Sequence, residues 1–498
     1  MTKFEPSEKH GVEYVPYNTQ NAEKINLVQL KPQNQSAKPD TFFFIMTILS
    51  GTVVATIMGS QLVWTSPVIP KITSNVSDDN PLGRTATTYE ISMIAGFPPL
   101  ATLAGPLFLG QLAEIFGRKR SMLIITLGEM LAVVCLAFST NVYCIVVFRC
   151  AIFMFFNASI TVLPVYLTEI CEDHNRARYG CLMGVMPPLG SLFGYVVGSF
   201  FTIRVFTLLS LSPLLLFIFF CVCAPESPVY SLSRGRREEC LNALRKLRSN
   251  KNEKEIEGDM YQIEQALKLR ANSSSGNIFT LFSTKEKRYA MLLALIPIMI
   301  QVFSGVTVLV QFMAPIFIAA GTKYNSNHLA IVVGSIKVVS FIIVSFVVEK
   351  TGRRYMLLIS AIGSSIPLSM LGGFFYLKHI NSSWIASLQW IPLTSIVGFM
   401  ITYSLGIGTI PMAIMGELFT PDVRAAGVSF IMTMLGICLF CATASFPIIN
   451  EFLGLYWCIW MYSVFCLAGA TFIYFMIPET KGKTVVEIQE YIKSRVNK

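Results

Sequence analysis

The segment Gly110-Gln-Leu-Ala-Glu-Ile-Phe-Gly-Arg-Lys-Arg120 interrupts a long apolar stretch with one acid, a glycine and three consecutive cations. A shorter copy, Val348-Glu-Lys-Thr-Gly-Arg-Arg354, lies between two further apolar runs in the second half of the chain. In both copies a glutamate precedes the first arginine by four residues. A charged turn that recurs once in each half, between hydrophobic segments, predicts a duplicated membrane protein. The two pairs are Glu114 with Arg118 and Glu349 with Arg353.

The composition supports a membrane protein. Of the 498 residues, 53% are hydrophobic and 14% are charged, and the mean hydropathy is +0.58. A soluble protein of this size needs more charge on its surface, whereas many segments here approach the roughly 20 apolar residues that cross a bilayer as a helix. The segments lack the alternation of barrel strands. We therefore expect an all-α membrane protein with twelve transmembrane helices in two pseudo-symmetric six-helix bundles.

The predicted spans fall into two sets of six, separated by a long charged region. Within that region, mixed-charge helical periodicity over 238–248 and 253–270 predicts short surface helices. The first forty residues are polar and lack the apolar core of a signal peptide. The expected parts are an N-terminal tail (1–40), a first bundle (41–223), a helical linker (224–288), a second bundle (289–477) and a C-terminal tail (478–498). The expected spans are 42–66, 89–113, 121–139, 143–167, 179–201, 205–223, 289–320, 329–348, 355–377, 390–415, 425–449 and 455–477.

Lysine and arginine set the expected orientation. The basic turns at 118–120, 176–178 and 353–354 share one side with the linker and both tails, and the positive-inside rule makes that side cytoplasmic. We expect a multi-pass plasma-membrane protein with both termini in the cytoplasm. Asn75 and Asn381 begin glycosylation sequons in outward loops and are the expected glycosylation sites. Asn272 begins a third sequon, which would face inward.

Other function classes find no support in the sequence. The net charge of +10 reflects cytoplasmic loops, and no nucleic-acid-binding motif accompanies it. The 12 cysteines lie mostly in apolar runs without metal-ligand spacing, and the four histidines are far apart. We therefore expect no metal, no cofactor, no enzymatic activity and no nucleic-acid partner. The expected partners are a small-molecule substrate and the lipid bilayer, and the expected state is a monomer.

Two further pairs of motifs extend the internal repeat. Glutamate precedes arginine by seven residues at the end of the fourth span of each half, and a Pro-Glu motif follows the sixth span of each half. Matched pairs in matched order predict two homologous six-span halves with a pathway between them. The first pair is Glu169/Arg176 with Glu417/Arg424, and the second is Pro225-Glu226 with Pro478-Glu479.

Over residues 45–490, these motifs resemble the major facilitator superfamily and, within it, the sugar porter family. The span around Trp64-Thr-Ser-Pro-Val-Ile-Pro70 is similar to insect trehalose and glucose facilitators. The resemblance implies a facilitative transporter of trehalose, glucose or a related hexose or polyol that works by alternating access. The residues that carry the resemblance are Gly110–Lys119, Arg149, Pro164–Ile170 with Arg176 and Gly180, Pro225–Pro228 with Arg234–Arg236, and Pro478–Gly482.

The resemblance also assigns roles to the repeated charges. It implies that Arg118 and Arg176 meet Glu169, and that Arg353, Arg354 and Arg424 meet Glu417. Such pairs would hold the two halves together at the cytoplasmic side and break in the inward-open state. A turn that serves only to orient the chain is the alternative. The expected cytoplasmic gate is Glu114, Arg118, Glu169, Arg176, Glu226, Glu349, Arg353, Arg354, Glu417, Arg424 and Glu479. Glu226 and Glu479 would tie cytoplasmic helices to the arginines, or lie in solvated turns.

The substrate site departs from the family pattern. Where the family has a second glutamine, an asparagine and a tryptophan, this chain has Val302, Thr307 and Met412, and the span 5 glutamine aligns with Gly184. Because buried hydroxyls need partners, these changes leave two alternatives to sugar transport open: transport of another small solute, and a non-transporting sugar sensor. The expected substrate-binding residues are Gly184, Gln301, Ser304, Gly305, Thr307, Gln311, Gly408, Pro411 and Met412.

Helical geometry predicts which of the polar residues of span 7 lie on the same face of the helix. Gln301 and Gln311 are ten residues apart, about 1000° of helical rotation, so both could line one pathway, whereas Thr307 lies about 120° from Gln301. Packing roles are the alternative for each. In span 10, Gly406, Gly408 and Pro411 predict a break that frees backbone carbonyls, or a packing kink.

Few charges lie within the predicted spans. Arg149 is expected to reach water near a span end. Lys337 lies near the centre of span 8, either snorkelling or facing the pathway, and Glu129 in span 3 is similarly open. Span 1 has no acid between Thr41 and Pro70, where proton-coupled sugar porters usually carry an aspartate, and this favours facilitated diffusion.

Overall fold

The computed structural model describes residues 41–74, 79–271, 278–347, 351–420, 423–483 and 485–496. Every regular element in these ranges is a helix. Twelve helical segments among the described residues are long and apolar enough to cross a bilayer. The predicted fold class and the number of spans are therefore confirmed.

Six spans form the first half of the chain, and three of them consist of more than one helix. Thr41 and Thr87 begin two of these spans as N-caps, each accepting a hydrogen bond from a backbone amide of the first turn. Pro98, Pro99 and Pro106 lie in span 2, where the missing amides disturb the α-helical ladder and a π-helix follows. The helices are α1 (Phe42–Val63), α2 (Thr65–Thr73), α3 (Thr88–Ala101), η1 (Gly105–Leu109), α4 (Leu112–Ile115), α5 (Arg118–Ala137), α6 (Val142–Ile170), α7 (Asp173–Phe200), α8 (Ile203–Leu209) and α9 (Ser212–Cys223).

The second half repeats this arrangement with different breaks. Span 7 bends at Gly305, whose φ of 81° is left-handed and favours glycine. Span 10 breaks over residues 406–409, where the sequence predicts it. The helices are α13 (Lys285–Phe303), α14 (Val306–Gln311), α15 (Met313–Ala320), α16 (Ser326–Val347), α17 (Arg353–His379), α18 (Ile391–Leu405), α19 (Ile410–Leu418), α20 (Arg424–Leu453) and α21 (Leu455–Met476), with short 3₁₀ turns at Ile278–Phe282 and Ser383–Ala386.

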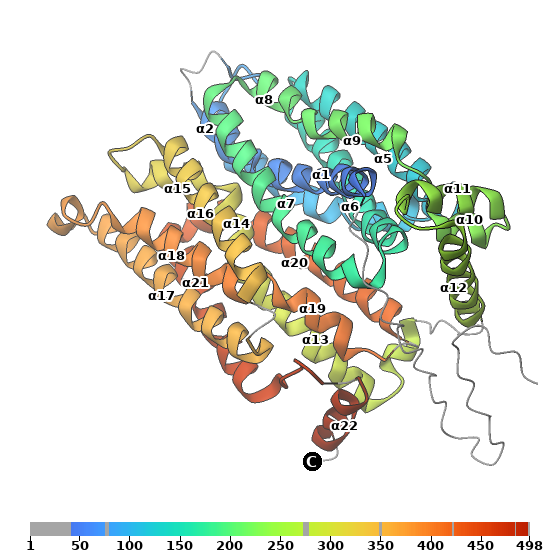
Figure 1. Cartoon of the computed structure of the whole chain (residues 1–498). Coiled ribbons are helices and arrows are strands. Elements are labelled where there is room, and N and C mark those ends of the chain that lie inside the picture. Colours follow the sequence, from blue (N-terminus) through green and yellow to red (C-terminus); the bar gives the residue numbers. More distant parts are fainter. Residues whose placement is uncertain are drawn as a thin grey trace, which may run out of the picture. The chain divides into compact units, whose positions relative to one another are not determined.

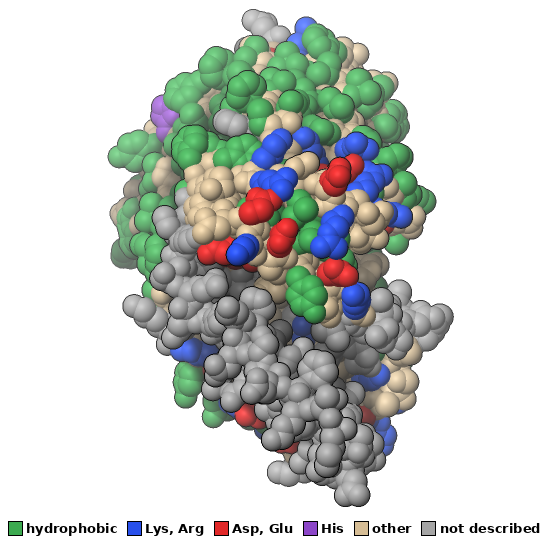
Figure 2. Space-filling view, turned by 45° about the vertical axis from the view of Figure 1, so that its right-hand side comes forward, with side chains coloured by type: hydrophobic (Ala, Val, Ile, Leu, Met, Phe, Trp, Pro, Cys, Tyr) green, Lys and Arg blue, Asp and Glu red, His purple; other side chains and the backbone are tan. Residues whose placement is uncertain are grey.

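Four α-helices that belong to none of the candidate spans lie at one end of the spans, which we call the basic end (Figure 1). It carries α10 (Pro228–Ser233), α11 (Arg237–Leu247), α12 (Glu253–Ala271), α22 (Val485–Val496) and the turns before α5 and α17. The linker helices have a small core of their own around Cys240 and Leu244, and burial raises the pKa of the Cys240 thiol to about 11. Figure 2 shows acidic and basic side chains interspersed over one patch, with hydrophobic side chains beside it.

The two halves contact each other toward the opposite end. There α7 packs on α16, α3 packs on α20, and α1 packs on α14. Thr65 Oγ1 donates to the carbonyl of Gln311 at 2.9 Å, and the Tyr195 hydroxyl donates to the carbonyl of Val310 at 2.8 Å. Gly96 lies so close to Ala444 that an added Cβ would be 2.5 Å from the Ala444 Cβ.

The basic end is packed differently. The buried cluster there that contains Phe44, Met122, Leu167 and Phe217 draws all its described members from the first half and the linker. The core that spans both halves includes Val63, Ile69, Ala95 and Tyr195, which lie toward the opposite end. The described packing between the halves is therefore concentrated away from the basic end.

Candidate functional site

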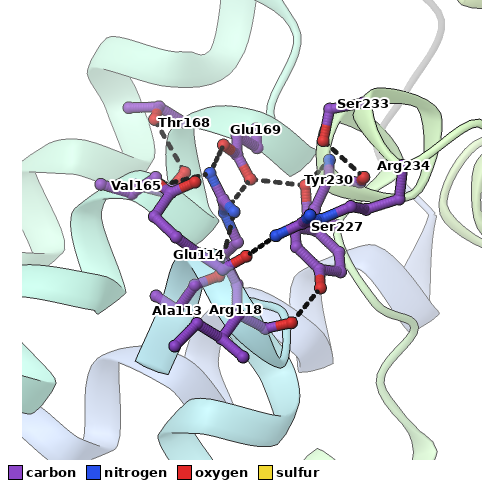
Figure 3. Close-up of polar contacts among 11 residues, drawn as sticks. Ala113, Glu114, Arg118, Val165, Thr168, Glu169, Ser227, Tyr230, Ser233 and Arg234 are labelled. Atoms are coloured by element: carbon purple, nitrogen blue, oxygen red, sulfur yellow. Dashed lines mark hydrogen bonds and ion pairs between the residues drawn. The ribbon is translucent and has the colours of Figure 1, made fainter. Parts of the chain in front are cut away.

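The first charged cluster joins the start of span 3 to the end of span 4 (Figure 3). Arg118 Nη2 donates to Glu169 Oε1 at 3.0 Å, and Arg118 Nε lies 3.0 Å from Glu169 Oε2. Both side chains are only 8% exposed. Arg118 also donates to the carbonyl of Ala113 at 3.1 Å and contacts Glu114 at 3.4 Å. The ion pair that the sequence suggests between Arg118 and Glu169 is present, with Glu114 as a weaker and largely exposed partner.

Two residues of the linker complete this cluster, although the sequence did not single them out. The Ser227 hydroxyl donates to Glu169 Oε2. The Tyr230 ring lies 5.2 Å from the Arg118 guanidinium, and its hydroxyl donates to the carbonyl of Ile115. Ser227 lies within the motif Pro225–Pro228 and Tyr230 follows two residues later, so their position after the repeated Pro-Glu was the available signal.

Glu226 caps the start of α5. Its carboxylate accepts from the backbone amide of Lys119 at 2.9 Å, where a helix N-terminus leaves amides free and favours negative charge. Gly117, with φ of 97°, permits this approach, because a Cβ there would lie 2.5 Å from Glu226 Oε2. The Lys119 ammonium donates to the carbonyls of Val222 and Ala224. Glu226 therefore binds backbone amides, not the arginine guanidinium that the sequence reasoning expected.

The second half has a corresponding cluster. Arg353 Nη1 forms an ion pair with Glu417, and the Glu479 carboxylate accepts from the amides of Arg353 at 3.0 Å and Arg354 at 3.2 Å. A Cβ on Gly352 would lie 2.5 Å from Glu479 Oε2. In both halves a glutamate of the Pro-Glu motif thus accepts hydrogen bonds from backbone amides at the start of the third span of that half, so the repeat is structural as well as sequential. The Arg353–Glu417 pair is more open than its counterpart, since its side chains are 25% and 31% exposed.

Several expected partners differ in the structure. Arg354 donates to the carbonyl of Tyr474 and lies over its ring, and Arg424 donates to the carbonyl of Phe419, so neither has a described contact with Glu417. Glu349 and the side chain of Arg176 lie outside the described residues. The described pairs also join helices of the same half, because Arg118 and Glu169 are both in the first half and Arg353 and Glu417 in the second. The expectation that these pairs bridge the halves is corrected accordingly.

Gln301 connects span 7 to the break in span 10. Its Nε2 donates to the carbonyls of Ile407 at 3.0 Å and Gly408 at 3.3 Å. Ser360 supports the same break, accepting from the amide of Ile407 at 3.0 Å and donating to the carbonyl of Thr402 at 2.7 Å. The break therefore frees carbonyls, as the glycines and proline predict, but Gln301 binds two of them.

Gln311 is in a different environment from Gln301. Its side chain is fully buried, and neither amide atom has a hydrogen-bond partner among the described residues. Because the chain turns at Gly305 into a new helix, the rotation of 1000° that related the two glutamines assumed a continuous helix that does not exist. Gln311 lies beside span 1, where its carbonyl accepts from Thr65. Thr307, between the two glutamines, is half-buried.

The other predicted substrate residues divide into structural and open positions. Ser304 donates to the carbonyl of Gln301, and an added Cβ on Gly305 would lie 2.3 Å from the Tyr462 ring. Pro411 is buried near the start of α19. Gly184 on α7 is exposed, with no atom within 4 Å of an added Cβ, and Met412 is 41% exposed.

Three charged residues that the sequence places within the spans, Arg149, Glu129 and Lys337, are buried or nearly so. Arg149 is fully buried, with its guanidinium 4.7 Å from the Trp64 ring and 5.6 Å from the Phe153 ring, and its Nε donates to the carbonyl of Ile94. The expectation that Arg149 reaches water is therefore wrong; aromatic faces stabilise it instead. Glu129 is fully buried, and Lys337 is 9% exposed.

A cavity of about 340 Å³ lies between the halves at the end opposite the basic end. Ile69 and Ile91 line it from the first half, and Phe312 and Phe446 from the second. Asn381, on this side of the second half, is exposed and adopts a left-handed φ of 52°. Asn75 and Asn272 lie outside the described residues.

The family model described as sugar (and other) transporter matches residues 45–491. The chain belongs to the sugar transporter family of the major facilitator superfamily. It is 28% identical to a facilitated trehalose transporter Tret1-2 homolog of Drosophila simulans over 461 residues, which cover 92% of both chains. It is 28% identical to the facilitated trehalose transporter Tret1 of Culex quinquefasciatus over 469 residues, 94% of this chain and 89% of the relative.

Solved structures of the same fold come from Escherichia coli. The inward open structure of the xylose transporter XylE superposes with a TM-score of 0.74 at 18% sequence identity. The match covers 90% of this chain and 100% of the XylE chain. A partially occluded inward open conformation matches 89% of this chain and 100% of its own, with a TM-score of 0.71 and 19% identity. The family comprises transporters rather than enzymes.

Proposed function

We propose that this protein is a facilitative transporter of a sugar, such as trehalose, glucose or a related hexose or polyol, and that it works by alternating access. The family match over residues 45–491 supports the transporter class, and the facilitated trehalose transporters among the relatives favour a sugar. The absence of an acid between Thr41 and Pro70 favours uniport. The protein is proposed to act as a monomer in the plasma membrane.

The observation that carries the alternating-access proposal is the uneven packing of the halves. Contacts such as Thr65–Gln311 and Tyr195–Val310 close the pathway away from the basic end, while the buried cluster at the basic end belongs to one half and the linker. By the positive-inside rule the basic end faces the cytoplasm, and both termini are proposed to lie on that side. The conformation is then an inward-facing one, and rocking of one half on the other would open the opposite side.

In this proposal the charged clusters contribute to the cytoplasmic gate because they hold the helices of each half rigidly together at the basic end. Arg118–Glu169 and Arg353–Glu417 fix the basic ends of spans 3, 4, 9 and 10, and the caps by Glu226 and Glu479 attach the segments after spans 6 and 12. Each half would therefore move as one body. Arg176, Arg354, Arg424, Glu114 and Glu349 remain proposed members of the gate.

Uptake by the full chain in proteoliposomes tests the proposal. Labelled trehalose, glucose and other hexoses should equilibrate across the membrane without a proton gradient, faster than in empty vesicles. If no sugar of a broad panel enters while other small solutes do, the substrate assignment is wrong. Ligand-induced thermal stabilisation without flux would instead identify a sensor. Glycosylation at Asn381 is tested by a mobility change in Asn381→Gln after expression in eukaryotic cells.

A further inference from the structure

One buried charge has no role in the gate or in the sugar site. Lys337 lies 11 residues after the start of α16 and ten before its end, about 15 Å from either terminus at 1.5 Å per residue. It is therefore close to the middle of a transmembrane span, too deep for its side chain to reach a helix end easily. Its side chain is 9% exposed, and no described residue forms a hydrogen bond or ion pair with its ammonium group. A charge in this position is usually functional.

No acid of the neighbouring spans can serve as its counter-ion. α16 packs mainly on α7, α15 and α18. The segments 182–200, 313–320 and 391–405 of these helices contain neither aspartate nor glutamate, and neither does α16 itself. Glu417, on the continuation of span 10, pairs with Arg353, and Glu129 lies on α5, which packs on α6, α8 and α9. Among the described residues, the positive charge of Lys337 thus has no matching negative charge.

The position of Lys337 places it where the closed part of the interface ends. Gly334, one helical turn away on the same face of α16, abuts α7 of the other half, because an added Cβ would lie 2.9 Å from the Tyr195 ring and 3.5 Å from Leu192. Lys337 is one turn closer to the basic end. Gly184 on α7, two turns beyond Leu192 in the same direction, is exposed and has open space around it. Lys337 therefore lies one helical turn beyond the sealed contact at Gly334, toward the basic end.

Few of the residues predicted to bind a sugar have a side-chain polar group free to bind a hydroxyl. The Gln301 amide donates to the carbonyls of Ile407 and Gly408, and the fully buried amide of Gln311 has no hydrogen-bond partner among the described residues. Gly184 and Val302 offer no side-chain hydrogen bond. An ammonium group in a poorly hydrated site binds a carboxylate or phosphate far more favourably than a neutral hydroxyl, since a charge-assisted hydrogen bond also neutralises it.

We infer that the substrate is a hydroxylated solute that carries one anionic group, a carboxylate or a phosphate, and that Lys337 binds this group midway through the pathway. The inference rests on the proposed transport function and specifies acidic sugars as the preferred substrates, with the neutral sugars transported more slowly. Lys337 is then the residue that selects acidic over neutral sugars.

The test uses the full chain in proteoliposomes with four labelled solutes: glucuronate, glucose 6-phosphate, glucose and trehalose. Wild type should take up at least one of the acidic sugars at least tenfold faster than either neutral sugar, and the two acidic arms distinguish carboxylate from phosphate. Lys337→Met should reduce that uptake at least tenfold without reducing neutral-sugar uptake, whereas Lys337→Arg should retain it. Lys323→Met, which removes an exposed lysine from a loop, is the matched control and should behave as wild type.

Two results overturn the inference. Uptake restricted to neutral sugars would reject it while leaving the proposed transport function intact, as would acidic-sugar uptake that Lys337→Met does not change. Flux of no solute, by correctly inserted protein, would reject transport itself. Thermal stabilisation by the acidic sugars provides a readout independent of flux, and its loss in Lys337→Met but not in Lys337→Arg supports the inference. Size-exclusion profiles of both variants identify misfolding.

Discussion

Arg118 and Glu169 form a two-point ion pair, with Nη2–Oε1 and Nε–Oε2 distances of 3.0 Å, between helices of the same half. The equivalent pair in the second half, Arg353 with Glu417, also stays within its half. The two pairs differ in burial, since the side chains of the first are 8% exposed and those of the second 25% and 31%. The two pairs occupy equivalent positions in the repeat but differ in burial. The same substitution made in each half therefore measures how burial changes the contribution of the ion pair to stability.

Glu169→Gln should destabilise the protein more than Glu417→Gln. Removing one member of a buried pair leaves an uncompensated charge, at about 3–5 kcal/mol, whereas an exposed pair contributes about 0–1 kcal/mol. Thermal unfolding in detergent measures the difference. Equal decreases in unfolding temperature in both variants would contradict the difference in burial between the two ion pairs. In transport assays, Glu417→Gln should alter flux while membrane insertion persists.

Gly117→Ala should destabilise the protein more than Gly352→Ala. Both new methyl groups would approach a capping carboxylate to 2.5 Å, but only Gly117 has a positive φ, 97°, with a ψ of 168°. Backbone strain of this kind costs about 1–3 kcal/mol. Gly258→Ala is the matched control, because Gly258 lies on the exposed face of α12 with no atom within 4 Å of an added Cβ. It should raise stability by about 0.5–1 kcal/mol. Unfolding temperatures in the order Gly258→Ala, Gly352→Ala, Gly117→Ala, from highest to lowest, are expected.

Gln301→Ala should mainly lower the stability of the protein, whereas Gln311→Ala should mainly weaken substrate binding. Gln301→Ala removes hydrogen bonds to two carbonyls of span 10 and should lower stability by about 1 kcal/mol. Gln311→Ala breaks no described hydrogen bond, so any loss of stability should come from lost packing alone, while the KM of the transported solute should rise. Unfolding and uptake assays on both variants measure this split. A large stability loss in Gln311→Ala would show that its amide has a structural partner instead.

Cysteine accessibility tests the inward-facing conformation. Gly184→Cys should react with a membrane-impermeant maleimide from the basic end, since Gly184 is exposed, whereas Ala444→Cys should not, since Gly96 covers it. Maleimide labelling of each variant is compared with the wild-type level in inside-out and in right-side-out vesicles. The vesicles in which labelling exceeds that level show from which side the reagent reaches the cysteine. A reagent that reaches residue 184 only from the opposite side would mean that the assigned orientation or conformation is wrong.

The sequence was sufficient for the spans because each must supply about 20 apolar residues regardless of its neighbours. It also predicted the break in span 10, since Gly406, Gly408 and Pro411 act locally on the backbone. It did not predict the bend at Gly305, which separates Gln301 from Gln311, and it placed Arg149 in water although Trp64 and Phe153 cover it. Both errors involve a contact with a residue distant in the chain, Tyr462 beside Gly305 and Trp64 beside Arg149.

The sequence by itself determined a duplicated twelve-span membrane protein, its basic end and the repeated acid–arginine motifs, because hydrophobic length, charge and repetition are properties of local segments. Only the tertiary structure decided that Glu226 and Glu479 cap helices, that Arg354 and Arg424 contact carbonyls instead of Glu417, and that Lys337 is buried without a counter-ion among the described residues. These features depend on which helices pack together and in what rotation. Helix packing is fixed by side chains from many spans at once, so no single motif encodes it.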